Sequence, residues 1–122
     1  MKTKKLTAKE KHVIESCGTE MPFSSPLLKE KRDGTFVCKK CGNDLFDSKT
    51  KFDSGTGWPS FYELKNNKAV NLKKDFKMII PRTEVRCAKC DGHLGHLFKD
   101  AFNQPTGKRY CINGVALDFK KK

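Results

Sequence analysis

Two C-x-x-C pairs, Cys38–Cys41 and Cys87–Cys90, constrain the fold of this chain more than any other feature of its sequence. Structural zinc takes four ligands in a tetrahedron, with Zn–S distances of about 2.3 Å, and two such pairs supply four thiolates. The pattern therefore predicts one structural zinc ion with all four of these cysteines as its ligands.

The two pairs are separated by residues 42–86, a longer stretch than the roughly 15–20 residues between the pairs of a zinc ribbon. The metal is therefore expected to close a whole domain. A disulfide framework or two redox-active dithiols are the alternatives for these cysteines. The sequence opens without an apolar signal-peptide segment, so a cytoplasmic protein is expected. In a reducing cytosol, metal binding is more common than disulfide formation.

The chain of 122 residues has a formal net charge of +12, with 36% hydrophobic and 33% charged residues. This length predicts a single domain over residues 1–122, with its core at about 6–119 and basic tails. No stretch approaches the ~20 apolar residues of a transmembrane helix, so no membrane partner is expected. The charge raises nucleic-acid binding as a hypothesis. Because many lysines lie at the two ends, a solvated basic surface without a specific nucleic-acid partner is favoured.

Local patterns predict a mainly β domain that begins with a helix. Thr7 followed by Glu10 resembles a capping box, which predicts a helix from about Ala8 to Ser16. Short β-prone runs and alternating apolar residues predict strands. These strands are expected at Thr35–Val37, 76–80, Thr83–Val85 and 115–119.

Cys111 stands outside both pairs, in the run Arg109-Tyr-Cys-Ile-Asn113. Residues two apart on a strand share a face, so Arg109, Cys111 and Asn113 are expected to project together. A guanidinium beside a thiol favours the thiolate, which is the nucleophile. A small buried hydrophobic residue is the alternative interpretation of Cys111. Asn113-Gly114 is either a hairpin turn or a bulge, and the change of apolar parity across it favours a bulge at Gly114 in a continuing strand.

Two further segments carry side chains suited to chemistry. His93 and His96 lie three residues apart in a glycine-containing run, and histidine exchanges protons near neutral pH. Either histidine could instead bind the metal, but four cysteines already complete a tetrahedron. Trp58, the single tryptophan, lies in a glycine-rich loop. It is either a core anchor or one wall of a pocket for an apolar methyl group.

Together these segments resemble the B-type methionine-R-sulfoxide reductases. The matching stretches are Cys17–Phe23, Phe52–Phe61, Arg82–Cys87, Cys90–Phe98 and Arg109–Asn113. They occur in the order of the family and span roughly residues 6–119. The ordered set is much more specific than any one of its pieces.

The resemblance implies a fold of two antiparallel sheets, a β-tent, with a short N-terminal helix. It implies a zinc ion on both C-x-x-C pairs, away from the catalytic centre. It also implies a monomer that reduces methionine-R-sulfoxide in proteins and is recycled by a thioredoxin-like reductant. The residues it implies at the catalytic centre are the nucleophile Cys111 with Trp58, His93, His96, Asp100, Arg109 and Asn113 around it.

The sequence departs from the family pattern at Thr56, where many members carry a cysteine that recycles the nucleophile. Either another thiol forms the disulfide or an external reductant acts directly on the sulfenic acid. Cys17 is the one cysteine left after Cys111 and the four metal ligands, so it is the candidate resolving thiol.

Two other classes of protein compete with the reductase. One is a zinc-stapled nucleic-acid-binding module, which the basic charge and the paired cysteines favour. The long separation of the pairs, the spare Cys111 and the two histidines count against it. The other is a peptide-binding β domain that shares the fold but performs no chemistry.

Overall fold

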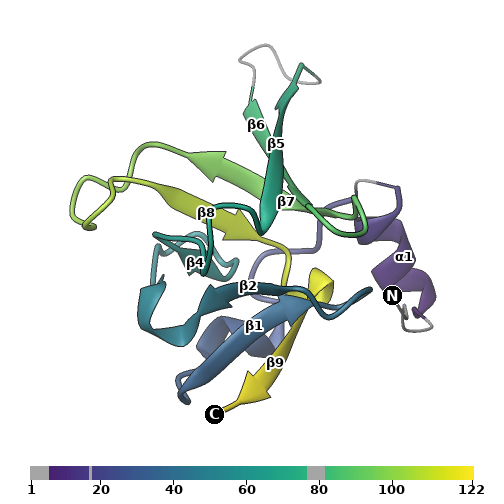
Figure 1. Cartoon of the computed structure of the whole chain (residues 1–122), viewed down its shortest axis with the longest axis horizontal. Helices are drawn as coiled ribbons and strands as arrows, with labels where there is room; N and C mark the ends of the chain where they lie inside the picture. The colour runs from purple at the N-terminus through teal and green to yellow at the C-terminus, as the bar shows by residue number, and fades with distance from the viewer. Residues whose placement is uncertain (1–5, 17, 77–81) are drawn as a thin grey trace.

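The computed structural model describes residues 6–16, 18–76 and 82–122, which form two antiparallel sheets (Figure 1). The three-stranded sheet has the order β2 (Asp44–Asp47), β1 (Gly34–Cys38) and β9 (Leu117–Lys121). The order in the six-stranded sheet is β3 (Lys51–Phe52), β4 (Ser60–Phe61), β8 (Arg109–Ile112), β7 (His93–Phe98), β6 (Arg82–Cys87) and β5 (Val70–Asp75). The prediction of a mainly β fold with two antiparallel sheets is confirmed.

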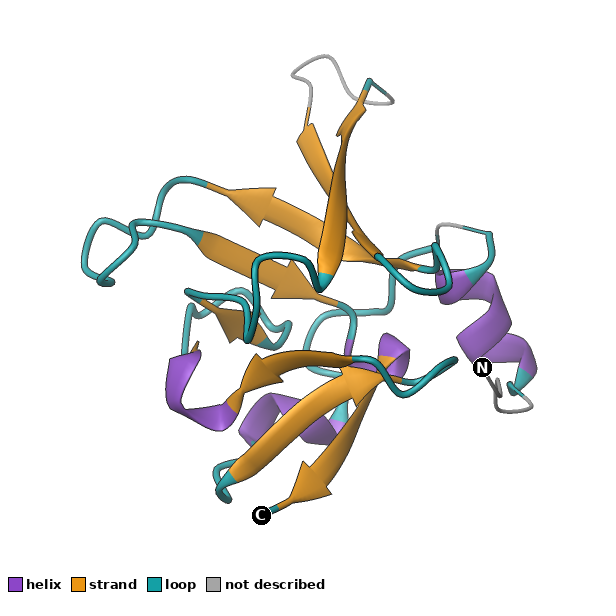
Figure 2. Cartoon of the chain, in the orientation of Figure 1, coloured by secondary structure: helices purple, strands orange, loops and turns teal. Residues whose placement is uncertain are grey.

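Among the described residues, helical structure is limited to one α-helix and three short 3₁₀ turns (Figure 2). The helix α1 (Ala8–Ile14) begins at the predicted capping box. The Thr7 hydroxyl accepts from the Glu10 amide at 3.2 Å, and the Glu10 carboxylate accepts from the Thr7 amide at 2.8 Å. The helix ends two residues before the predicted Ser16, after burying Val13 and Ile14 in the core. The 3₁₀ turns are η1 (Pro26–Lys29), η2 (Ser48–Thr50) and η3 (Gly114–Ala116).

An aromatic cluster joins the two sheets. The rings of Phe46 on β2 and Phe61 on β4 stack with centroids 4.2 Å apart. Phe36 on β1 meets the ring of Phe61 edge-on at 5.0 Å, and Tyr110 on β8 packs on Phe46 at 5.6 Å. The three phenylalanines are completely buried. Because each buried side chain of this size contributes about 1.5–3 kcal/mol, this cluster is a major part of the core.

The chain leaves the six-stranded sheet at Gly114, so the predicted bulge is wrong. Strand β8 ends at Ile112, η3 turns the chain, and β9 pairs with β1 in the other sheet. The reason is a long-range contact, because the amides of Gly114 and Val115 donate to the buried carboxylate of Glu20 at 2.7 and 3.0 Å. A side chain at Gly114 would overlap the hydroxyl of Ser25.

The strand predicted at 76–80 is not observed at Phe76, which directly follows the observed strand β5. Strand β5 ends at Asp75, and Phe76 is 72% exposed rather than part of a buried face. Met78 and Ile80 lie outside the described residues. The strands predicted at Thr35–Val37 and Thr83–Val85 lie within β1 and β6. The strand predicted at 115–119 is only partly right, because Val115 belongs to η3 and β9 begins at Leu117.

Candidate active site and metal centre

The four cysteines of the C-x-x-C pairs come together as predicted. Their sulfur atoms all lie within 4.8 Å of one another, close enough to bind one metal ion. Cys38 is the last residue of β1 and Cys87 the last residue of β6, so the cluster connects the two sheets. In the described part of the chain this group holds neither His93 nor His96, which excludes the mixed cysteine–histidine site.

Both C-x-x-C turns have the same backbone geometry. The Gly42 amide donates to the Cys38 carbonyl at 2.8 Å, and the Asp91 amide donates to the Cys87 carbonyl at 2.8 Å. Gly42 and Asp91 both adopt positive φ, at 79° and 59°. A hydrogen bond from Cys38 lowers the pKa of the Cys87 thiol to about 4. Thiolates are the form that binds zinc, and an all-sulfur tetrahedral set fits a structural zinc ion.

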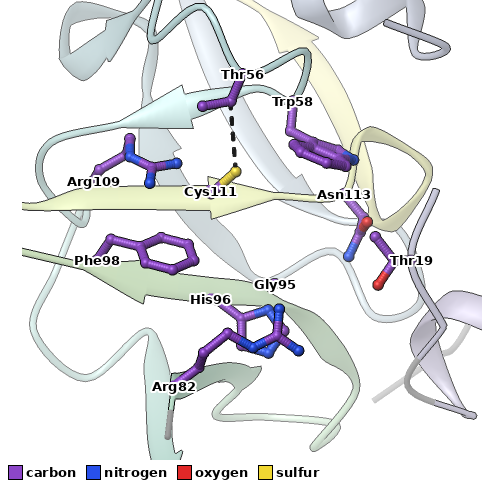
Figure 3. Close-up of a pocket in the computed structure, with 10 residues that line it drawn as sticks. All are labelled: Thr19, Thr56, Trp58, Arg82, Gly95, His96, Phe98, Arg109, Cys111 and Asn113. Carbon is purple, nitrogen blue, oxygen red and sulfur yellow. Dashed lines mark hydrogen bonds between the residues drawn. The ribbon is translucent and has the colours of Figure 1, made fainter. Parts of the chain in front are cut away.

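A pocket of about 210 Å³ lies on the six-stranded sheet (Figure 3), and none of the four clustered cysteines lines it. Its walls come from β6, β7, β8, the β3–β4 loop and the segment before η1. The lining residues are Thr19, Thr56, Trp58, Arg82, Gly95, His96, Phe98, Arg109, Cys111 and Asn113. Most of the predicted site residues therefore meet here, including the three that were expected to share a face of one strand.

Cys111 occupies the middle of the pocket on β8. It is paired with Ser60 of β4 on one side and with His96 of β7 on the other. In Figure 3 its sulfur points toward Thr56, while His96 and Phe98 lie on the opposite side of the strand. The neighbouring residue on β7 is Gly95, and a side chain there would overlap the Cys111 carbonyl, so the two strands approach closely.

Burial dominates the electrostatics of the Cys111 thiol. It raises the pKa of Cys111, and the hydrogen bond with Thr56 and the charge of Arg109 lower it by less. The guanidinium of Arg109 therefore favours the thiolate, as expected, but Cys111 is still mainly a protonated thiol near neutral pH. Arg109 itself is held by Asp100, whose carboxylate accepts two hydrogen bonds at 3.0 Å each. The guanidinium also lies 4.3 Å from the centre of the Phe98 ring.

His93 and His96 have different environments. The β6–β7 register shifts between Val85 and Arg86, where the partner changes from Gly95 to His93. The two imidazoles consequently approach, with ring centroids 5.5 Å apart, although residues three apart on a regular strand face opposite sides. His96 lines the pocket, whereas His93 is only 2% exposed and is not among the lining residues.

A carboxylate fixes the buried imidazole of His93. Its Nδ1 lies 2.7 Å from a Glu84 oxygen, and burial lowers the pKa of His93. An ionised carboxylate accepts only, so Nδ1 carries the proton of the neutral ring. His93 is therefore placed to support the ring of His96 and does not face the cavity.

The side chain of Asn113 is already hydrogen-bonded within the protein. Its oxygen accepts from the Glu20 amide at 3.0 Å, and its nitrogen donates to the Leu94 carbonyl at 3.0 Å. The Trp58 indole donates to the Glu20 carbonyl at 3.0 Å. Glu20 thus ties the N-terminal segment to two pocket residues, and nothing in the local sequence pattern singled it out.

Other pocket residues were also missed by the sequence analysis, which gave no role to Thr19, Arg82 or Phe98. These three residues lie in stretches that match the reductase family, namely Cys17–Phe23, Arg82–Cys87 and Cys90–Phe98. The candidate resolving thiol, Cys17, lies outside the described residues.

Comparison with known proteins identifies the family. The SelR domain model matches residues 6–121. The chain belongs to the SelR domain family. A relative from Leifsonia xyli subsp. xyli named peptide methionine sulfoxide reductase MsrB is 52% identical over 117 residues, which cover 96% of this chain and 84% of the relative. Proteins of the same name are 51% identical in Methanosarcina barkeri, over 96% of this chain and 82% of the relative, and 47% identical in Leptospira interrogans, over 98% and 90%.

The resemblance to B-type methionine sulfoxide reductases is thereby confirmed over nearly the whole length of this chain. The pocket residues and the four clustered cysteines all lie inside the matched range. None of the helices in the described part of the chain has the length and apolar character needed to cross a bilayer.

Replacing one metal ligand of this SelR domain tests the cysteine cluster. Cys90→Ser should lose bound metal and unfold, because structural zinc in small domains can contribute about 10–16 kcal/mol, as much as or more than a typical domain's whole stability. Metal content by mass spectrometry and thermal unfolding are the measurements. Cys111→Ser is the matched control and should keep its metal. A metal-free Cys90→Ser protein with an unchanged melting temperature would contradict the assignment.

The pKa of Cys111 gives a second prediction. Because burial raises this pKa above its ordinary value of 9.0, only a small fraction is thiolate at neutral pH. Without substrate, alkylation of Cys111 by iodoacetamide should accelerate about 10-fold per pH unit from pH 7 and continue rising through pH 9, since the thiolate is the nucleophile. Peptide mapping by mass spectrometry measures the rate, and an unfolded peptide with the same cysteine is the reference. A plateau below pH 8 would show that hydrogen bonds and charge outweigh burial.

Proposed function

We propose that this chain reduces methionine-R-sulfoxide in proteins to methionine, with Cys111 as the nucleophile. The observation that carries the proposal is the position of Cys111. It lies outside the cysteine cluster, in a pocket of about 210 Å³, directly across the sheet from His96. The relatives are named peptide methionine sulfoxide reductases, which agrees with this chemistry.

The reaction begins at the sulfoxide sulfur, which is electrophilic. The Cys111 thiolate attacks this sulfur, the oxygen passes to the cysteine, and methionine leaves. Cys111 becomes a sulfenic acid, so the thiol is oxidised by two electrons and the sulfoxide is reduced by two. A thiol with a raised pKa is a strong nucleophile once deprotonated, and it must lose its proton when the substrate is bound.

The residues around Cys111 divide the remaining work. His96 donates a proton or hydrogen bond to the sulfoxide oxygen as that oxygen gains basicity. Trp58 and Phe98 supply apolar surface for the methyl group of the substrate. Arg109, fixed by Asp100, places positive charge beside the thiolate.

Two of the predicted catalytic residues are better assigned to positioning. His93, paired with Glu84, holds the ring of His96 from behind. Asn113 uses its amide to hold Glu20, and through Glu20 the indole of Trp58. Both act on the substrate through their neighbours.

The metal is proposed to be zinc, held by Cys38, Cys41, Cys87 and Cys90. An all-cysteine tetrahedron leaves no open coordination position, which is typical of structural zinc. Its function is to hold the ends of β1 and β6 together, and no step of the reaction passes through it.

Recycling requires a second thiol, because Thr56 cannot form a disulfide. We propose that the sulfenic acid is reduced either through a disulfide with Cys17 or directly by a thioredoxin-like dithiol. Both routes release the oxygen as water. On the first, the Cys17–Cys111 disulfide is then reduced by a thioredoxin-like dithiol through thiol–disulfide exchange, and on the second the same kind of dithiol reduces the sulfenic acid itself, so that Cys111 returns to its thiol and the dithiol becomes a disulfide.

The nucleophile is tested with Cys111→Ser. Turnover of methionine-R-sulfoxide with dithiothreitol should fall by at least about 10³-fold, because the covalent step is lost. The S epimer, assayed in parallel, should be a poor substrate of the unaltered protein. The Cys111→Ser substitution should leave the metal content and the melting temperature unchanged. Appreciable remaining turnover would contradict the assignment of Cys111.

The division between His96 and Trp58 has its own kinetic signature. His96→Ala should lower kcat by about 10²-fold or more, because a proton donor acts mainly in the transition state. Trp58→Ala should mainly raise KM, by about 10-fold, since it removes apolar contact with the methyl group. Steady-state kinetics with a methionine sulfoxide peptide separates the two effects. If His96→Ala keeps the full kcat, the histidine is structural.

A further inference from the structure

Three hydroxyl groups form an unbroken chain that ends on the Cys111 sulfur. The Thr56 hydroxyl lies 3.8 Å from Cys111 Sγ and 2.8 Å from the Ser54 hydroxyl. The Ser54 hydroxyl lies 2.7 Å from that of Ser60, which also reaches the Trp58 carbonyl at 3.1 Å. Ser60 is completely buried and is the strand partner of Cys111.

The number of protons in this chain allows two directions of donation. Each hydroxyl has one hydrogen and can accept as well as donate. With Cys111 as a thiol, donation can run from sulfur to Thr56, then to Ser54, then to Ser60, and end at the Trp58 carbonyl. With Cys111 as a thiolate, it can run the opposite way, from Ser60 through Ser54 and Thr56 to the sulfur.

The loop that carries Ser54 and Thr56 is held by contacts that do not involve the Cys111 side chain. The Asp53 carboxylate accepts from the Gly55 amide at 2.9 Å, and the Phe23 amide donates to the Gly57 carbonyl at 2.7 Å. Gly55 and Gly57 have φ of 74° and 90°, which a residue with a side chain adopts rarely. The loop therefore presents Thr56 to the sulfur without needing a bond from it.

We propose that Thr56, supported by Ser54 and Ser60, is a positioning residue that reverses its hydrogen bond to Cys111 when the thiol ionises. The inference rests on the proposed role of Cys111 as nucleophile and extends it. Thr56 accepts from the resting thiol, donates to the thiolate that attacks the sulfoxide, and donates to the oxygen of the sulfenic acid. Only hydroxyl rotation is involved, and no atom other than a proton changes position along the chain.

This arrangement answers a difficulty raised by the burial of Cys111. Burial disfavours the charged sulfur, and a hydrogen bond to a charged group is among the stronger ones in proteins. A donor that is itself polarised by two further hydroxyls donates more strongly than an isolated one. Ser54 and Ser60 hydrogen-bond each other, and a hydrogen bond from Ser60 also lowers the pKa of Cys111.

The test uses Thr56→Val, which keeps the shape of the side chain and removes its hydroxyl. The rate of Cys111 alkylation by iodoacetamide is measured by peptide mapping from pH 6 to pH 10 in the metal-bound protein. The rate at pH 8 should fall about 10-fold in Thr56→Val, because the thiolate loses its donor. Thr56→Ser should restore it to within about 2-fold, and Ser54→Ala should give an intermediate loss of about 3-fold.

Thr35→Val on β1 is the matched control, since Thr35 lies away from the pocket and bonds the Lys65 ammonium instead. It should leave the alkylation profile unchanged. An unchanged profile in Thr56→Val, or a Thr56→Ser variant that behaves like Thr56→Val, would overturn the inference. If Thr56→Val unfolds, Ser54→Ala is compared with Thr35→Val instead. Ser54→Ala also interrupts the chain of hydroxyls, so an unchanged alkylation profile in this variant would overturn the inference. These readouts need no turnover, so they are independent of the Cys111→Ser assay of the proposed function.

Discussion

The cluster of four cysteines connects the two sheets, and the rest of the structure depends on how these sheets meet. Cys38 and Cys87 end one strand of each sheet, and their sulfur atoms lie within 4.8 Å of one another. The two sheets also share a buried aromatic cluster, but aromatic packing alone is tolerant of small displacements. A tetrahedral metal site is not, because ligand distances and angles are fixed by the ion. A metal ion on these four sulfur atoms, as proposed, would therefore set how the strand ends meet.

The second long-range constraint is the buried carboxylate of Glu20. Burial raises its pKa, and the amides of Gly114 and Val115 lower it in part. A buried carboxylate is tolerated when it accepts several hydrogen bonds, and here it also fixes the turn between β8 and β9. The same residue holds the indole of Trp58 and the amide of Asn113 through its backbone. The shape of the pocket thus depends on a residue that does not line it.

The site combines a half-buried thiol with groups able to stabilise its charge. Burial alone makes Cys111 a weak acid, while Thr56, Arg109 and Ser60 oppose that effect. A resting thiol is less exposed to adventitious oxidation than a resting thiolate, because oxidation follows thiolate character. A substrate that fills the pocket and excludes water would strengthen every one of these electrostatic contacts. The geometry is therefore suited to a nucleophile that is activated in the complex.

Local sequence patterns were enough to predict several features of this protein. The spacing of the C-x-x-C pairs predicted the metal ligands, and Thr7 with Glu10 predicted the start of the helix. The period of two in a strand placed Arg109, Cys111 and Asn113 on one wall of a pocket. These properties depend on residues a few positions apart, whose relative geometry is fixed by the backbone.

Which of the two histidines faces the pocket depends on how the strands pair, because a register shift between β6 and β7 brings the two imidazoles together while only His96 of the pair lines the pocket. The tertiary structure also decided that the chain changes sheets at Gly114, through the carboxylate of Glu20 that lies 94 residues away in sequence. The contact between Thr56 and Cys111 likewise joins residues 55 positions apart. Such contacts depend on how the strands pair and pack, and no local pattern of residue types specifies them.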